Sequence, residues 1–203
     1  MKIIIYFLLI MTAIHIYLHF VIHPENYLSI LKDITREEIT NTVYYKLPFI
    51  INGNDIVQPI QLKECIKIDK GTYTKTYEPI SFIEPFVKFF TNDYVYKLKK
   101  NKFLPKHFNL ECRNFYIVHK GIVKVHVIHP KYKDVLTDNI ENHSKILQIT
   151  LTEKEMIFVP NYWGVYIKAL DDAIIEKVQY KTILNHANFL WDYVNNINIT
   201  KLL

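Results

Sequence analysis

The first part of the chain is apolar on every side. Residues 3–22 form a run of 20 positions without Asp, Glu, Lys or Arg, and Pro24 follows soon after. Twenty helical residues rise about 30 Å, which matches the hydrocarbon core of a bilayer. A buried core helix would instead be polar along one face. The pattern therefore predicts one membrane-spanning helix, so that residues 1–23 are an N-terminal membrane anchor and residues 24–203 form a single domain.

A cleaved signal peptide is the main alternative for this segment. Such a peptide has a shorter apolar region and ends at a small-x-small cleavage site, which residues 11–13 do not supply. Lys2, ahead of the apolar run, favours an N-terminus in the cytoplasm and a C-terminal domain on the other side of the membrane. In that single-pass topology the sequons at Asn142 and Asn198 are exposed to glycosylation.

Beyond the anchor, the pattern first predicts a mixture of helices and short strands. Residues 24–45 are expected to be helical, because Thr35 and Glu38 have the spacing of a capping box. A short strand over 47–51 ends at an Asn-Gly turn. The elements expected next are strands over Glu64–Ile68 and Thr72–Tyr77 and a helix from Pro79 to Leu98.

The second half of the chain alternates between apolar and polar positions with period two, which is typical of strands. The clearest example is Ile122–Ile128, which follows a Lys-Gly turn and stops at Pro130. Helices followed by a meander of strands predict an α+β fold with an antiparallel barrel or jelly roll. The expected strands are Phe115–His119, Ile122–Ile128, Ile146–Leu151, Met156–Val159, Val165–Leu170 and Ala173–Tyr180, followed by a helix over Ile183–Val194.

The composition supports a folded domain and argues against some classes of partner. Half of the 203 residues are hydrophobic, which is enough for a packed core. The net charge of +5 is spread along the chain, and its densest basic stretch, from Lys97 to Lys106, is expected to be a solvated loop. The sequence has no zinc-finger or RNA-recognition pattern, so no nucleic-acid partner is expected. Cys65 and Cys112 form no Cys-x-x-Cys site, and the sequence leaves open whether they pair.

Two motifs in the second half carry the candidate chemistry. The first runs over residues 107–121, HFNLECRNFYIVHKG, and the second over 151–167, LTEKEMIFVPNYWGVYI. Together with KLPFIING at 46–53, they resemble the motifs of the JmjC or cupin-like hydroxylases of the asparaginyl-hydroxylase type, in the same order, over most of residues 45–180. In that family the first motif contains His-x-Asp, Asn-Phe and Lys-Gly, and the second contains Gly-Asp, Ile-Pro and Trp-Trp-His. The resemblance implies a double-stranded β-helix (cupin or jelly-roll) barrel with flanking helices for residues 24–203.

The resemblance also implies where a metal site would be. The family holds Fe(II) with two histidines and one carboxylate, which leaves positions for 2-oxoglutarate and oxygen. By position, His107 stands at the first histidine, Asn109 at the carboxylate and Val165 at the second histidine, while the cosubstrate lysine falls on Val123. An amide is a poor ligand for Fe(II) and valine has no lone pair, so these are degenerate ligand positions. The sequence therefore predicts no bound metal, no cofactor and no catalytic residue.

Two alternatives stand beside this interpretation. Glu111 could supply a carboxylate, and His119, His126 or His143 an imidazole, to an Fe(II)- and 2-oxoglutarate-dependent hydroxylase with substituted ligands. An unrelated anchored protein with chance motifs would have no closed barrel. The favoured prediction is a catalytically inactive cupin or JmjC-like module, anchored through residues 3–22, that binds an unknown protein or small molecule. Its richness in Ile, Asn, Lys and Tyr suggests an AT-rich genome such as that of a large DNA virus, and hence a host endomembrane or a virion membrane.

Overall fold

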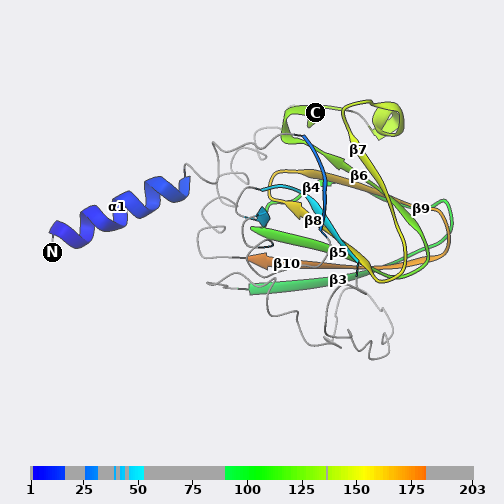
Figure 1. Ribbon diagram of the computed structural model, residues 1–203, viewed down its shortest axis with the longest axis horizontal. Helices are drawn as coiled ribbons and strands as arrows, with labels where there is room; N and C mark the ends of the chain where they lie inside the picture. Colours follow the sequence, from blue (N-terminus) through cyan, green and yellow to red (C-terminus); the bar gives the residue numbers. More distant parts are fainter. Residues whose placement is uncertain are drawn as a thin grey trace, which may run out of the picture.

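The computed structural model describes a β-rich domain and an N-terminal helix (Figure 1). The residues that it describes are 2–16, 26–31, 39, 42–43, 46–52, 90–135 and 137–181. Several predictions lie outside these residues, namely the strands over Glu64–Ile68 and Thr72–Tyr77, the helix over Ile183–Val194, Cys65 and Asn198.

The described strands form two sheets. The larger has the order β1-β2-β8-β5-β10-β3 and the smaller has the order β4-β9-β6-β7. The strands of the larger sheet are β1 (Ser29–Leu31), β2 (Phe49–Asn52), β3 (Phe90–Leu98), β5 (Arg113–Lys120), β8 (Glu155–Pro160) and β10 (Ala173–Lys181). Those of the smaller sheet are β4 (Phe103–Phe108), β6 (Val123–Ile128), β7 (Leu147–Leu151) and β9 (Gly164–Ala169).

The strands from β3 to β10 pair in a nested pattern. β6 pairs with β7, β5 with β8, β4 with β9 and β3 with β10, all antiparallel. Residues 90–181 therefore form one long folded hairpin, and its successive strand pairs alternate between the larger and the smaller sheet. The β5–β10 and β6–β9 pairings then join the two arms within each sheet. This topology is a jelly roll, or double-stranded β-helix. The β-rich cupin-type fold expected from the sequence is therefore confirmed.

The core follows from the period-two alternation of the strands. Val123, Val125 and Val127 of β6 share one face and pack with residues of both sheets in a buried cluster inside the barrel. A second buried cluster covers the outer face of the larger sheet, where the rings of Phe49 and Phe158 stack with centroids 4.9 Å apart. Strands that are buried on both faces in this way have long apolar runs, which explains why the second half of the sequence is so hydrophobic.

The segment between β6 and β7 packs against the smaller sheet. It contains two short 3-10 helices, η3 (Pro130–Tyr132) and η4 (Thr137–Asn142). Ile140 of η4 is buried with Tyr166 of β9 in a third apolar cluster. His126, also fully buried, lies beside Tyr166 with ring centroids 5.3 Å apart.

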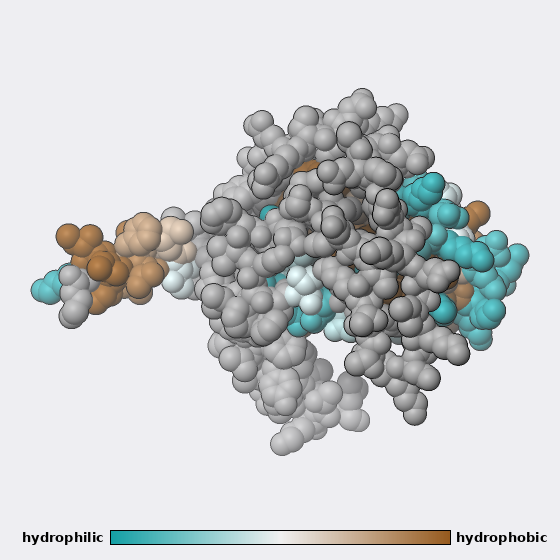
Figure 2. Space-filling model, turned by 90° about the horizontal axis from the view of Figure 1, so that it is seen from below, coloured by the Kyte–Doolittle hydropathy of each residue, from teal (hydrophilic) through white to brown (hydrophobic). Residues whose placement is uncertain are grey.

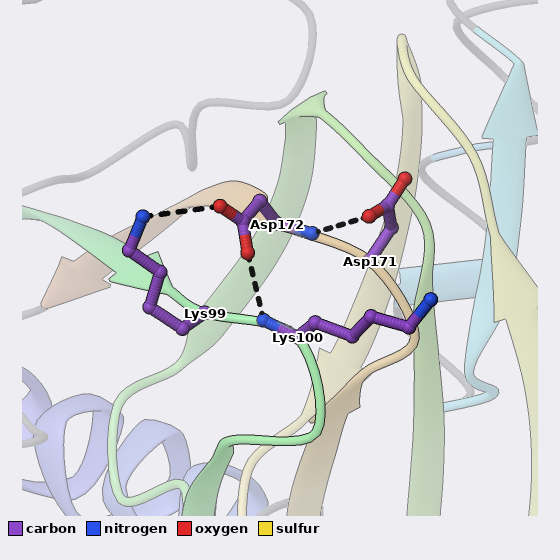
Figure 3. Close-up of polar contacts among 4 residues, drawn as sticks. All are labelled: Lys99, Lys100, Asp171 and Asp172. Atoms are coloured by element: carbon purple, nitrogen blue, oxygen red, sulfur yellow. Dashed lines mark hydrogen bonds and ion pairs between the residues drawn. The ribbon is translucent and has the colours of Figure 1, made fainter.

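The turn after β3 and the turn between β9 and β10 meet at one end of the barrel (Figure 3), and the turn between β5 and β6 approaches the second of them. Asp172, between β9 and β10, accepts hydrogen bonds from the Lys100 backbone N–H at 2.9 Å and from the Lys99 ammonium at 3.1 Å. Gly121, between β5 and β6, has a φ of +82°, and a Cβ atom built there would lie 2.3 Å from the carbonyl oxygen of Asp172. The Asp172 carboxylate therefore links two turns, and the backbone of a third turn packs closely against it at Gly121.

Three elements expected from the sequence are wrong. Residues 90–98, expected within a helix from Pro79 to Leu98, form β3, whose nine residues all pair with β10. Ser29–Leu31, expected within a helix over 24–45, form β1, which pairs with β2. The lysine-rich stretch expected to be a solvated loop contains β4, Phe103–Phe108. In each case pairing with a strand distant in sequence decides the structure, and local propensity does not.

The N-terminal helix α1 spans Lys2–Ile16 and projects away from the sheets (Figure 1). Its large apolar side chains from Ile3 to Met11 are 49–84% exposed and form the apolar projection in Figure 2. Among the described residues, no helix is both long and apolar enough to span a bilayer. Residues 17–23 of the expected anchor lie outside the described residues.

Candidate functional site

The strand register brings the three degenerate ligand positions together. His107 in β4 lies opposite Val165 in β9, and Asn109 directly follows β4. The backbone of Asn109 is held by the β8–β9 turn, because its N–H donates to the Trp163 carbonyl at 3.0 Å and its carbonyl accepts from the Tyr162 N–H at 2.6 Å. The site is thus built on two paired strands and one turn.

A tyrosine links the side chains at these positions. Tyr116, on β5, donates its hydroxyl proton to Oδ1 of Asn109 at 2.8 Å, and the same hydroxyl oxygen lies 2.8 Å from Nε2 of His107. On the other side of the imidazole, Nδ1 lies 3.0 Å from the carbonyl oxygen of Pro105. Burial raises the pKa of Tyr116 well above its usual value, so the phenol keeps the proton that it donates. One hydroxyl group therefore lies against both Nε2 of His107 and the amide oxygen of Asn109, and Nδ1 of His107 faces the Pro105 carbonyl.

These residues do not fit an Fe(II) site of the hydroxylase type. That site needs two imidazoles and a carboxylate, whereas the residue opposite His107 is a fully buried valine and Asn109 has a neutral amide. Within the described part of the chain, no group of three or more His, Cys, Asp or Glu side chains is placed to hold a metal ion. One imidazole and one amide stand where the hydroxylases have three strong ligands.

The side chains considered as substitute ligands contact other groups. Glu111 lies 3.8 Å from the ammonium of a lysine on β10. His119 forms a buried pair with Glu176, with Nε2 and Oε2 2.6 Å apart. His126 packs on the outer face of the smaller sheet, and His143 follows η4 in the β6–β7 segment. The described contacts therefore join none of the four to His107.

The motifs did not indicate two further members of this site, Tyr116 and Lys177. Lys177, on β10, lies opposite Tyr116 in the sheet, and its ammonium is 5.4 Å from the centre of the tyrosine ring in a cation–π contact. Lys177 is only 6% exposed. The available signal was its position two residues after Ile175, because alternation places both side chains on the inner face of β10.

Replacing Tyr116 with phenylalanine is expected to destabilise the domain by about 1–3 kcal/mol, because it leaves Nε2 of His107 and Oδ1 of Asn109 without their shared partner in a buried place. Chemical denaturation of the wild type and the Tyr116→Phe variant measures this difference. Tyr27→Phe, at a tyrosine that is 45% exposed, is the matched control and should cost little. An equal loss in both variants would contradict a structural role for the hydroxyl of Tyr116.

The site should also make stability depend on pH. Burial and the charge of Lys177 lower the pKa of His107 from 6.5 to about 4. The unfolded chain then binds more protons than the folded one between these values, so stability present at neutral pH is lost as the pH falls through this window, by about 3 kcal/mol at most. Denaturation at pH 7 and pH 4.5 should show a smaller acid loss in His107→Gln than in the wild type. Equal losses would show that the ring of His107 titrates as it does in the unfolded chain.

Known proteins resemble this chain only weakly, and only in structure. No protein-family model matches the chain, and no curated protein matches its sequence. Matching solved structures include a conserved protein of unknown function from Streptococcus pyogenes (12% identity, TM-score 0.35, 45% of this chain and 64% of that one). They also include the coconut allergen cocosin, with 13% identity and a TM-score of 0.37 over 46% of this chain and 22% of that one. A third is the oxalate decarboxylase formate complex of Lactobacillus farciminis, with 14% identity and a TM-score of 0.35 over 45% of this chain and 24% of that one. The match spans less than two thirds of each of these proteins, and the fold assignment above rests on the strand order instead.

Proposed function

We propose that this chain is a membrane-anchored binding module whose cupin-type barrel has no catalytic activity. The observation that carries the proposal is the chain of contacts from His107 through Tyr116 to Asn109, which engages the atoms that a metal ion would need. Freeing His107 to bind a metal would leave Tyr116 with one partner fewer in a buried place, which disfavours the exchange. Val165 supports the same conclusion, because its side chain has no lone pair to offer.

The test is the metal content of the purified full-length chain after incubation with Fe(II), together with turnover of 2-oxoglutarate. The wild type is expected to hold far less than one iron per chain and to release no succinate. Restoring the hydroxylase ligands with the double substitution Asn109→Asp and Val165→His is the matched control, and it should bind iron because the backbone already places these positions beside His107. Stoichiometric iron with turnover in the wild type would instead establish the hydroxylase with substituted ligands.

The anchor is part of the same proposal. The exposed apolar side chains of α1 support it, because a contiguous apolar surface of this kind needs a membrane or a protein to cover it. In this arrangement residues 3–22 enter the bilayer and residues 24–203 lie on the extracytoplasmic side. Asn142 is exposed at the end of η4, where a glycan could be attached.

Translation of the full chain in the presence of microsomes tests this orientation. A glycan on Asn142 should lower the gel mobility of the membrane-bound chain, and the Asn142→Gln variant should lose that shift. Asn198→Gln provides the comparison at the second sequon. A membrane-bound chain that carries no glycan at either position would place the domain on the cytoplasmic side.

A further inference from the structure

The outer face of the smaller sheet buries a histidine that makes no hydrogen bond through its ring. His126 of β6 is 0% exposed, and neither of its ring nitrogens has a hydrogen-bond partner among the described residues. Its neighbours across the sheet are the phenol Tyr166 of β9 and Gln148 of β7, which carries no charge. Ile140 of η4 packs on the same face, in the apolar cluster that contains Tyr166. A buried imidazole without a partner is costly, and it becomes far more costly when it carries a charge.

The charged groups around His126 do not favour its protonation. Lys124 lies two positions earlier on the same face of β6, and Lys168 lies opposite Lys124 on β9. The carboxylate that faces His126 belongs to Glu141 of η4, and it is already paired with Lys168, with Oε1 and Nζ 2.7 Å apart. Burial and, after it, the charge of Lys124 lower the pKa of His126 from 6.5. Glu141 and the backbone of Tyr166 act in the opposite direction and only reduce this shift.

The segment between β6 and β7 is held to the smaller sheet by side chains of the sheet. Gln148 of β7 donates from Nε2 to the carbonyl of Glu141 at 2.8 Å. Lys106 of β4 donates from Nζ to the carbonyls of Val135 at 2.6 Å and Lys133 at 3.1 Å. These bonds join side chains to backbone carbonyls and include no strand pairing. The segment can therefore separate from the sheet as a local unit while the barrel stays folded.

We propose that protonation of His126 releases the segment between β6 and β7 from the smaller sheet and exposes the apolar cluster beneath it. In the open state water solvates the imidazolium, whereas in the closed state the charge would be buried beside two lysines. The open state therefore binds the proton more tightly, and acid favours opening by up to about tenfold for each pH unit below 6.5. Opening would uncover Ile128, Ile140, Ile146 and Tyr166. This response to pH goes beyond the proposed function and depends neither on the iron-free site nor on the anchor.

Amide hydrogen exchange of the full-length chain in detergent micelles, corrected for the intrinsic effect of pH on exchange, measures this opening. The probes are the N–H groups of Val135 and Ile146, which donate to carbonyls within the segment. Their opening equilibrium should rise at least about threefold from pH 7.5 to pH 5.5, while the amides of β5 and β8 stay protected. His126→Leu should remove the rise, because leucine takes up no proton. His143→Leu, at a half-buried histidine of the same segment, is the matched control and should retain it.

The His126→Leu variant should fold, because an apolar side chain fits an apolar cluster better than an unpaired imidazole does, and its melting temperature at pH 7.5 reports this. His126→Gln, which cannot titrate either, is the second variant. A rise that is confined to the segment, absent from both His126 variants and kept in His143→Leu supports the proposal. A rise that persists in either His126 variant, or that His143→Leu also abolishes, overturns it. So does a wild type that shows no rise, or one whose β5 and β8 amides lose protection equally.

Discussion

Replacing Trp163 with alanine is expected to lower the free energy of unfolding by about 3–5 kcal/mol. Trp163 is 1% exposed, belongs to the cluster inside the barrel and meets the ring of His129 edge-to-face, with centroids 4.7 Å apart. Truncation removes this whole surface and leaves a cavity that the rigid sheets cannot fill. Because the Trp163 carbonyl also accepts from the N–H of Asn109, the cavity lies directly beside the candidate site.

Urea denaturation of the wild type, Trp163→Ala and Trp163→Phe measures this effect. Phenylalanine keeps an aromatic ring in the cluster, so its loss should be much smaller than that of alanine. If the Trp163→Phe and Trp163→Ala variants were equally destabilised, the indole nitrogen and not the volume of the ring would be the important feature. A loss below about 1 kcal/mol in the alanine variant would show that the side chain is not packed in the core.

Replacing Gly121 with alanine should cost about 2–4 kcal/mol, from two effects that act together. The φ of +82° is strained for any residue with a Cβ, and that Cβ would lie 2.3 Å from the Asp172 carbonyl oxygen and 3.0 Å from the Cα of Ala173. These neighbours are backbone atoms between two paired strands, so they cannot move aside without disturbing the β9–β10 turn.

Gly164→Ala is the matched control for this second prediction. A Cβ at Gly164 would meet Cε1 of Phe108 at 2.9 Å, which is part of a side chain that can turn, and its φ lies outside the left-handed region. Thermal unfolding should therefore show a clearly larger loss for Gly121→Ala than for Gly164→Ala. The reverse order would mean that the turns at this end of the barrel adjust more easily than the core around Phe108.

The strands of the second half could be predicted because their alternation is local. Val123 to Ile128 show period two in the sequence itself, and the turn at Gly121 marks where β5 gives way to β6. The segments that were mispredicted depend on partners far along the chain. Phe90–Leu98 has aromatic residues at spacings that suit a helix, yet it pairs with β10 in the sheet. That pairing cannot be predicted from the local sequence of either strand.

The candidate site divides in the same way. The order of the motifs pointed to His107, Asn109 and Val165 as positions of interest, although the spacing from Asn109 to Asn114 is one residue longer than in the hydroxylase pattern. Alternation along β10 places Lys177 on the same face as Ile175, but its contact with Tyr116 depends on the register of β5 against β10, which the sequence does not give. Without that register, a lysine in a strand is expected to face solvent, as most lysines do. The burial of Lys177 becomes visible only in the folded sheet.

The position of β10 between β5 and β3 has a consequence for how the chain is made. Its partners in β3 lie more than 70 residues earlier in the sequence, so they leave the ribosome long before it does. Until β10 is added, β3 and β5 each present a row of unsatisfied backbone groups to any other extended chain. A polypeptide that stops short of Ala173 would therefore be prone to self-association through these exposed strand edges.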